Sequence, residues 1–329
     1  MKYPYTQEVE LKKDFKDLKY TFIFEVTYLC DKKCPYCYNS KDRMIGASYF
    51  DKLRVFNEIL NLKDKFQIII LGGEPSKFEG TIKFYHLFGK KYGEIPGYRF
   101  IIFSHGNADP NFYKQFRPYK NNNILFSWHE DQTDEDLFFR NMEILKNNGV
   151  RFGTCINIGL NKKDWEKKLK ILERVKKMGG MTQIEPIFIK NKKYFFKEMR
   201  EYFKEYFYKC VKYNNIKIQS EDKSEILKFD FNDYELLPQG IEGPKKCYNK
   251  QFLIDPFLNL SPECNFFPEL KINLKNNPKK LYNYIRNQII SCNFNCLSKS
   301  NVFNKKELTE ESFNKIKDII NENRIERSK

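Results

Sequence analysis

The feature that most constrains the fold of this chain is the alternation of strand and helix patterns between residues 18 and 190. Residues 66–71 are apolar apart from Gln67, which is typical of a parallel strand that is buried on both faces. The six expected strands cover residues 20–27, 66–71, 98–104, 124–128, 152–159 and 183–189. Repeated β–α units of this length predict parallel strands joined by right-handed crossovers, and therefore an α/β fold.

Sequence signals also place helices and divide the chain. A helix is expected after the fourth strand, with Thr133 as its N-cap and Gly149 at its end. Others are expected at residues 49–62, 163–178 and 309–324. The expected divisions are an N-terminal extension (1–17), the α/β unit (18–190), a helical connector (191–243), a cysteine-bearing segment (244–300) and a C-terminal helix (301–329).

Three cysteines follow the first expected strand. Cys30, Cys34 and Cys37 have the spacing C-x3-C-x2-C, with Tyr36 just before the last. Three thiolates in one short loop can hold three irons of a cubane cluster and leave the fourth iron open, whereas four-cysteine ferredoxin runs close the cluster. The alternatives are a zinc site or three unrelated thiols. Structural zinc sites usually have four ligands, and no fourth Cys or His lies nearby.

A Gly-Gly-Glu-Pro turn, formed by Gly72, Gly73, Glu74 and Pro75, directly follows the second expected strand. Glycines at the carboxyl end of a strand let the backbone approach a ligand closely, and Pro75 stiffens the turn. Taken alone, this sequence would indicate an ordinary turn. Its position after a strand, downstream of the cysteine triad, favours a binding role.

The triad and the turn together resemble the motifs of the radical S-adenosylmethionine (radical SAM) family, with Tyr36 at the aromatic position of the triad. The resemblance implies a partial (β/α)6 TIM-like barrel, smaller than a full eight-unit barrel. It implies a 4Fe-4S cluster on the triad, whose open iron binds the amino and carboxylate groups of S-adenosylmethionine. One-electron cleavage then gives a 5'-deoxyadenosyl radical that abstracts a substrate hydrogen. The Gly-Gly-Glu-Pro turn would bind the amino group.

Polar residues at the other strand ends complete the predicted site. The cofactor contacts expected from the resemblance are Ser104, Asn107, Ser127 and, toward the adenine, Asn157. His129 and Glu130 are candidates for general acid/base catalysis or substrate contact, because active sites of βα barrels form at this end. Cys155 is a candidate hydrogen-atom donor, although a small buried cysteine in a strand is commoner.

Four late cysteines form the second group: Cys247, Cys264, Cys292 and Cys296. Their spacing resembles the SPASM/twitch extensions of radical SAM enzymes, with Asn259 where glycine is usual. Asn tolerates a left-handed backbone better than other non-glycine residues. Four cysteines instead of seven imply the shorter twitch form, with one auxiliary 4Fe-4S cluster on a β-hairpin plus helix at residues 244–300. A structural zinc on the same thiolates is the alternative.

Composition bounds the location and the partners. Nine cysteines without a signal-peptide pattern in residues 1–16 predict a cytoplasmic protein with metal or redox chemistry, and no apolar run is long enough to span a membrane. The formal net charge is +16, from 59 Lys and Arg against 43 Asp and Glu. This charge suits an anionic partner, or it reflects lysines that solvate the surface.

The expected reaction is oxidation, crosslinking or epimerisation after hydrogen abstraction, with a reductant such as flavodoxin or ferredoxin. The preferred substrate is a ribosomal peptide, although no separate leader-binding domain is recognisable in the residues before the first strand. One alternative is a radical dehydrogenase or epimerase of a sugar, aminosugar or nucleotide. Another is a nucleic-acid-binding or tRNA-modifying iron–sulfur protein, for which steep salt dependence would be expected.

Overall fold

The computed structural model describes most of the first two thirds of the chain and parts of the rest. The described residues are 19–34, 37, 44–129, 132–158, 162–186, 202–203, 216–219, 226–229, 244–248, 251–262, 271–286, 289–290, 305–308, 310, 314 and 317–318. The chain divides into two compact units. The first comprises Met1–Asn157, Asp164–Thr182 and Phe252–Ile285, and the second comprises Ile158–Lys163, Gln183–Gln251 and Arg286–Lys329.

A nine-stranded sheet organises the first unit. Its order is β12-β11-β10-β1-β2-β3-β4-β5-β6. The six strands in chain order are β1 (Tyr20–Thr27), β2 (Phe66–Gly72), β3 (Arg99–Ser104), β4 (Asn122–Trp128), β5 (Arg151–Ile158) and β6 (Met181–Pro186). The pairs from β1 to β5 are parallel. The carboxyl ends of these strands therefore lie at one edge of the sheet, which is where the predicted site residues fall.

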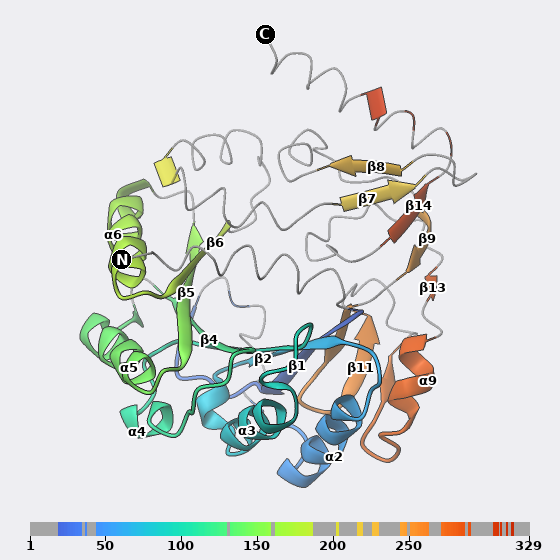
Figure 1. Ribbon diagram of the computed structural model, residues 1–329, viewed down its shortest axis with the longest axis horizontal. Coiled ribbons are helices and arrows are strands. Elements are labelled where there is room, and N and C mark those ends of the chain that lie inside the picture. The colour runs from blue at the N-terminus through green and yellow to red at the C-terminus, as the bar shows by residue number, and fades with distance from the viewer. Residues whose placement is uncertain are drawn as a thin grey trace. The chain divides into compact units, whose positions relative to one another are not determined.

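Helices connect the strands: α2 (Tyr49–Leu60), α3 (Thr81–Tyr92), α4 (Pro110–Tyr113), α5 (Glu135–Asn147) and α6 (Trp165–Lys177), with the short 3-10 turns η1 (Pro75–Lys77) and η3 (Lys162–Asp164). Helices α2, α3 and α4 lie on one side of the strands (Figure 1). The core between them is aromatic, because Phe56 of α2 stacks on Phe84 of α3 with ring centroids 4.2 Å apart. Phe84 in turn stacks on Phe24 of β1. The expected α/β alternation is confirmed.

The start of α5 differs from the sequence prediction. Asp134, rather than Thr133, is the N-cap, because its carboxylate accepts a hydrogen bond of 3.0 Å from the Leu137 N–H. The Thr133 hydroxyl instead donates to the carbonyl oxygen of His129 at 2.8 Å. The prediction of Thr133 as the cap was therefore wrong by one residue. Thr133 is instead bonded to the main chain of His129, just after the end of β4.

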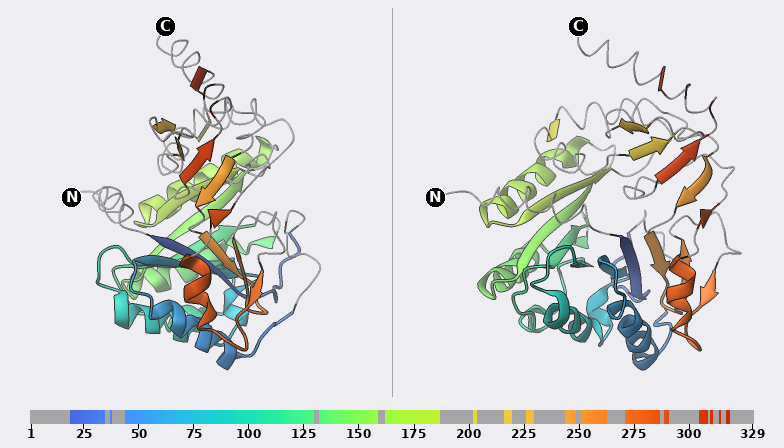
Figure 2. Two further views of the ribbon diagram at one scale, coloured as in Figure 1. Left: turned by 90° about the vertical axis from the view of Figure 1, so that its right-hand side faces the viewer. Right: turned by 45° about the vertical axis from the view of Figure 1, so that its right-hand side comes forward.

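A C-terminal hairpin extends the sheet beside β1. It consists of β10 (Gln251–Ile254) and β11 (Asn259–Pro262), followed by β12 (Ile272–Asn273) and α9 (Lys280–Arg286). Phe252 of β10 stacks on Phe22 of β1 with ring centroids 5.8 Å apart. Figure 2 shows these C-terminal strands next to the N-terminal β1. The first unit thus combines residues before 183 with the later segment Phe252–Ile285.

Asn259, which stands where the SPASM/twitch pattern usually has a glycine, directly follows the turn of this hairpin. The left-handed residue is Leu258, with φ 67°, and not Asn259. The Asn259 side chain instead donates to the carboxylate of Asp255 at 2.8 Å, while its amide oxygen accepts from Asn273. Asn259 therefore does not use the left-handed backbone that its residue type tolerates. Asn259 stabilises the hairpin through its side-chain amide, which bonds to Asp255 and Asn273.

The second unit holds a five-stranded sheet in the order β13-β9-β14-β7-β8. Its strands are β7 (Ile216–Gln219), β8 (Ile226–Phe229), β9 (Pro244–Tyr248), β13 (Ile289–Ile290) and β14 (Lys305–Leu308). Cys247 lies on β9, opposite Ile290 of β13 and Lys306 of β14. Among the described residues, no helix is long and apolar enough to cross a membrane.

Candidate active site

The cysteine loop leaves the carboxyl end of β1 and returns to its own starting point. The Tyr28 N–H donates to the carbonyl oxygen of Met44 at 2.9 Å, which closes the base of the loop. Just beyond, the Ala47 N–H donates to the carbonyl oxygen of Pro256 at 2.7 Å. Gly46 has φ +80°, and a Cβ there would collide with the same carbonyl group. The loop that carries the triad is therefore pinned to the β10–β11 hairpin.

The Gly-Gly-Glu-Pro turn packs directly against the start of this loop. The Gly73 N–H donates to the Thr27 carbonyl oxygen at 2.6 Å, and the Glu74 N–H donates to that of Leu29 at 2.7 Å. A Cβ on Gly72 would collide with the Thr27 carbonyl oxygen, and one on Gly73 with that of Leu29. These glycines allow two main-chain segments to touch, a reason that differs from the close ligand approach inferred from sequence.

Glu74 lies beneath the turn as a buried anchor. Only 1% of it is exposed. Its Oε1 accepts from the Ser76 N–H at 3.0 Å and from the Ser104 hydroxyl at 2.9 Å, and its Oε2 accepts from the His105 N–H at 2.8 Å. The Ser104 oxygen also lies 2.8 Å from the hydroxyl of Tyr113. Glu74 thus fastens the end of β2 to the end of β3.

His105 extends this network to the cysteine loop. Its Nδ1 accepts a hydrogen bond of 3.0 Å from the Asn107 N–H, so the proton of the neutral ring is on Nε2. That Nε2 lies 2.9 Å from Oδ1 of Asp31 and 3.4 Å from Oε2 of Glu74. Burial opposes ionisation of Asp31, but His105, the main-chain N–H of Asp31 and Lys77 together outweigh it, so the pKa of the Asp31 carboxyl is lowered.

Cys34 is the buried member of the triad, with 8% exposed. Its Sγ lies 3.2 Å from Nδ1 of His129, at the end of β4, and the Gln132 side-chain amide donates to it at 3.8 Å. Burial, followed by the nearby His105 and Lys32, lowers the pKa of His129 to about 4. The His129 ring is therefore neutral at pH 7, and one of the predicted acid/base candidates is in contact with a predicted cluster ligand.

The donor chemistry of the loop fits an iron–sulfur cluster. Cys30, Cys34 and Cys37 are free thiols. Burial raises the pKa of Cys30, opposed by the Lys32 N–H, which donates to its Sγ at 3.4 Å. Metal binding therefore requires that this thiol lose its proton. Within the described ranges, no three His, Cys, Asp or Glu side chains converge on a point as metal ligands would.

Other predicted residues lie along the same edge of the sheet. Ser127 of β4 is directly opposite Cys155 of β5, so both side chains are on the same face. Cys155 is 4% exposed, as expected of a core cysteine, and Asn157 is half-buried. Asn107 bonds the neighbouring loops: its amide donates to the carbonyl oxygen of Asp134 at 2.8 Å, and its oxygen accepts from Lys32 at 3.2 Å.

Several predicted residues lie outside the described part of the chain. These are Tyr36, Glu130, Cys264, Cys292 and Cys296; Cys247 is described only as part of strand β9. Their assignments stay predictions. The structure also brings in Asp31, His105 and Gln132, which the sequence interpretation did not select. The available signal was their position, since Asp31 is inside the triad loop and the other two follow strand ends.

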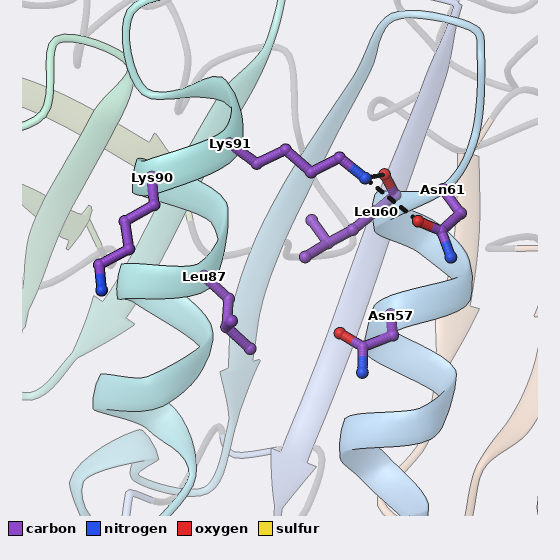
Figure 3. A pocket seen from close by; sticks show the side chains of 6 residues that line it. All are labelled: Asn57, Leu60, Asn61, Leu87, Lys90 and Lys91. Atoms are coloured by element: carbon purple, nitrogen blue, oxygen red, sulfur yellow. Dashed lines mark hydrogen bonds between the residues drawn. The ribbon is translucent and has the colours of Figure 1, made fainter.

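A separate shallow pocket lies between α2 and α3, lined by Asn57, Leu60, Asn61, Leu87, Lys90 and Lys91 (Figure 3). The Lys91 ammonium donates to the carbonyl oxygen of Leu60 at 2.7 Å and to the side chain of Asn61 at 3.1 Å, so it caps the end of α2. None of the predicted site residues lines this pocket. We therefore interpret these contacts as structural.

Comparison with solved structures identifies the fold. SuiB of Streptococcus suis, bound to S-adenosylmethionine, superposes with a TM-score of 0.53 at 13% identity, and the match covers 84% of this chain and 69% of SuiB. The anSMEcpe structure with bound AdoMet (S-adenosylmethionine) and the Kp18Cys peptide gives a TM-score of 0.53 at 14% identity, covering 81% of each chain. SuiB bound to its precursor peptide SuiA gives 0.52 at 12% identity, covering 86% of this chain and 70% of SuiB.

These likenesses are structural. No protein-family model matches the sequence, and no curated protein matches it. At such low identity a superposition shows a common fold, and the short motifs in the cysteine loop and the Gly-Gly-Glu-Pro turn add local chemistry to it. The chain therefore has the partial-barrel fold of the radical SAM family, in agreement with the resemblance that its two motifs carry.

Proposed function

We propose that this protein is a radical SAM enzyme that modifies a peptide. The observation that supports this most strongly is the direct main-chain contact between the triad loop and the Gly-Gly-Glu-Pro turn, at the carboxyl ends of β1 and β2. The contact brings together the two motifs that the resemblance assigns to one cofactor. The shared fold supports the same reading, since SuiB and anSMEcpe are described with S-adenosylmethionine bound.

In this proposal Cys30, Cys34 and Cys37 hold a 4Fe-4S cluster. Such a cluster supplies the electron that cleaves S-adenosylmethionine and an open iron to which it binds. The chain's own residues position the loop. Glu74 already accepts three hydrogen bonds from its partners, so we assign it to holding the ends of β2 and β3 together. Recognition of the amino group of S-adenosylmethionine then falls to main-chain carbonyls of the turn.

The late cysteines supply a second element of the proposal. Cys247 lies on β9, whose neighbours in the sheet are β13 and β14; in the sequence Cys292 follows β13 by two residues, and Cys296 precedes β14 by nine residues. Cys247 and the strand that precedes Cys292 in the sequence are therefore neighbours in one sheet, which supports a common role for the late cysteines. We infer that Cys247, Cys264, Cys292 and Cys296 hold an auxiliary 4Fe-4S cluster. Four thiolates saturate it, so it would relay electrons and favour an oxidative outcome.

A peptide is the substrate class that the comparisons favour. Two of the matched structures contain SuiB with its precursor peptide SuiA and anSMEcpe with the Cp18Cys peptide. The formal net charge of +16 suits an acidic peptide, because opposite charges speed association and improve specificity. Salt dependence of peptide binding would therefore be expected.

The test is anaerobic reconstitution of the full chain, followed by iron counting and an assay for 5'-deoxyadenosine. We expect about eight irons per chain, from two four-iron clusters, and S-adenosylmethionine cleavage with a strong reductant. The triple Cys30→Ala, Cys34→Ala, Cys37→Ala variant should keep about half the iron and lose cleavage. Cys155→Ala, which changes a buried thiol outside both groups, is the matched control and should keep all the iron.

Two results would overturn the proposal. Zinc in place of iron, or an iron-loaded protein that does not cleave S-adenosylmethionine, would exclude the radical SAM assignment. Loss of all iron in the triple variant would instead remove the auxiliary cluster and leave the first assignment intact.

A further inference from the structure

We propose that the turn between β4 and α5 is a positioning element for the cluster: His129 and Gln132 donate hydrogen bonds to the sulfur of Cys34 and raise the reduction potential of the cluster that the triad holds. The inference rests on the proposed function, because it requires Cys34 to be a cluster ligand. It gives His129 a role different from the acid/base role expected from sequence.

The geometry places two N–H donors on one sulfur. Nδ1 of His129 is 3.2 Å from Sγ of Cys34, and Nε2 of Gln132 is 3.8 Å from it. A cluster-bound cysteine is a thiolate, which has no proton and can only accept. The ring nitrogen that faces it must therefore be the donor. Cys34 is the most buried of the three cysteines, so water competes little for these bonds.

The orientation of Gln132 is fixed from its other side. Its side-chain oxygen accepts from the Lys33 N–H at 2.5 Å, which leaves the amide nitrogen to face Cys34. The ammonium group of Lys32 also donates to the main-chain carbonyl oxygen of Gln132. Consecutive loop residues 32, 33 and 34 are thus all bonded to Gln132. Such repeated contact is what a positioning element requires.

The turn itself is held in shape by Thr133. The His129 N–H donates to Oγ1 of Thr133 at 3.0 Å, and the Thr133 hydroxyl and N–H both donate to the His129 carbonyl oxygen, at 2.8 and 2.9 Å. These three bonds fix the backbone from which the imidazole projects. The donor on Cys34 is therefore presented by a preorganised turn.

Hydrogen bonds to ligand sulfurs are among the factors that set the potential of an iron–sulfur cluster. Reduction adds negative charge, part of which resides on the sulfurs. An N–H that points at a sulfur stabilises this charge, so the reduced state gains relative to the oxidised state. Removal of the donor should therefore shift the midpoint potential to more negative values while the three iron ligands stay in place.

The experiment is an EPR-monitored redox titration of the reconstituted full chain. The signal of the triad cluster is identified by its change on addition of S-adenosylmethionine, and the triple-cysteine variant supplies the auxiliary signal for subtraction. His129→Phe should shift the midpoint potential of the triad cluster to more negative values. His129→Asn should restore it toward wild type, because the Asn amide has an N–H close to the Nδ1 position. His86→Phe, the same substitution on α3, should leave it unchanged.

The outcomes separate this inference from the proposed function. Wild-type protein without a cluster that responds to S-adenosylmethionine would refute the proposed function. A responsive wild-type cluster with an unchanged potential in His129→Phe, or a negative shift in His129→Asn as large as in His129→Phe, would refute the inference alone. If His129→Phe does not load iron, Gln132→Met decides: a negative shift supports the inference, and no shift overturns it.

Discussion

Replacement of Glu74 by glutamine tests whether this carboxylate is a structural anchor. The carboxylate accepts from two main-chain N–H groups on opposite sides, that of Ser76 on Oε1 and that of His105 on Oε2. A glutamine amide has only one acceptor oxygen. Whichever way it turns, its NH2 group faces one of these N–H donors. The substitution therefore always leaves one main-chain N–H without an acceptor, either the buried one of His105 or the part-buried one of Ser76, although it hardly changes the volume.

The size of the effect follows from the bonds that are lost. A hydrogen bond to a charged group contributes about 1.5–3 kcal/mol, and a buried unsatisfied donor costs about 1–3 kcal/mol. Relief of the desolvation of the charge offsets part of this. We expect Glu74→Gln to lower the free energy of unfolding by about 2–3 kcal/mol, which is on the order of a 100-fold change in the folding equilibrium.

Urea unfolding of the reduced, metal-free chain measures this effect. The chain has two tryptophans, and both Trp128 and Trp165 are buried, so their fluorescence reports on this part of the structure. Glu79→Gln, five residues away on the surface, is the control and should change the free energy by less than about 0.5 kcal/mol. A Glu74→Gln variant as stable as this control would refute the anchoring role.

Two further predictions concern the exit of the cysteine loop. Gly46→Ala should destabilise the protein more than Gly179→Ala. Both glycines have positive φ, which costs about 1–2 kcal/mol for alanine, but a Cβ at Gly46 would also collide with the carbonyl group of Pro256, whereas Gly179 has open space around it. Equal losses of unfolding free energy in urea would contradict this. Buried Lys52 donates to the Ile45 carbonyl oxygen at 2.7 Å, and burial lowers its pKa to about 8. Between pH 8 and 10.5 the unfolded chain holds more protons at Lys52 than the folded chain does. The free energy of unfolding of the wild type, measured relative to that of Lys52→Met, should therefore rise with pH by about 3 kcal/mol in total. A difference between the two proteins that does not change with pH would contradict the lowered pKa.

The sequence predicts the strands of the barrel well, because buried parallel strands are nearly continuous apolar runs such as Phe66–Gly72. It also places the triad and the Gly-Gly-Glu-Pro turn at neighbouring strand ends. Helix α3 is a different case. It contains Gly89, and a Cβ there would collide with the ring of Tyr119. A glycine inside a helix lowers local propensity, and only the packing partner explains it.

Sequence patterns did not predict the hydrogen bonds between the loops of the site. Local rules accept either Thr133 or Asp134 as a cap, with a preference for Asp, and in the structure the Thr133 hydroxyl is already bonded to the carbonyl oxygen of His129. The bonds from Gln132 and His129 to Cys34 join residues almost 100 positions apart. No periodicity or spacing encodes such pairs. They follow only when the strand order brings the end of β4 near the loop after β1.

The place of β10 beside β1 has a consequence for the way this chain is made. In the described sheet, β1 has β2 on one side and β10 on the other. Residues 20–27 therefore lack their second neighbouring strand until residues 251–254 have been synthesised. A ribosome that adds about 5–20 residues per second needs on the order of 10–50 s to cover that interval. During this time an apolar strand has an open edge that could pair with another nascent chain. Production of the protein should therefore depend on chaperones, and chains that end before β10 should aggregate.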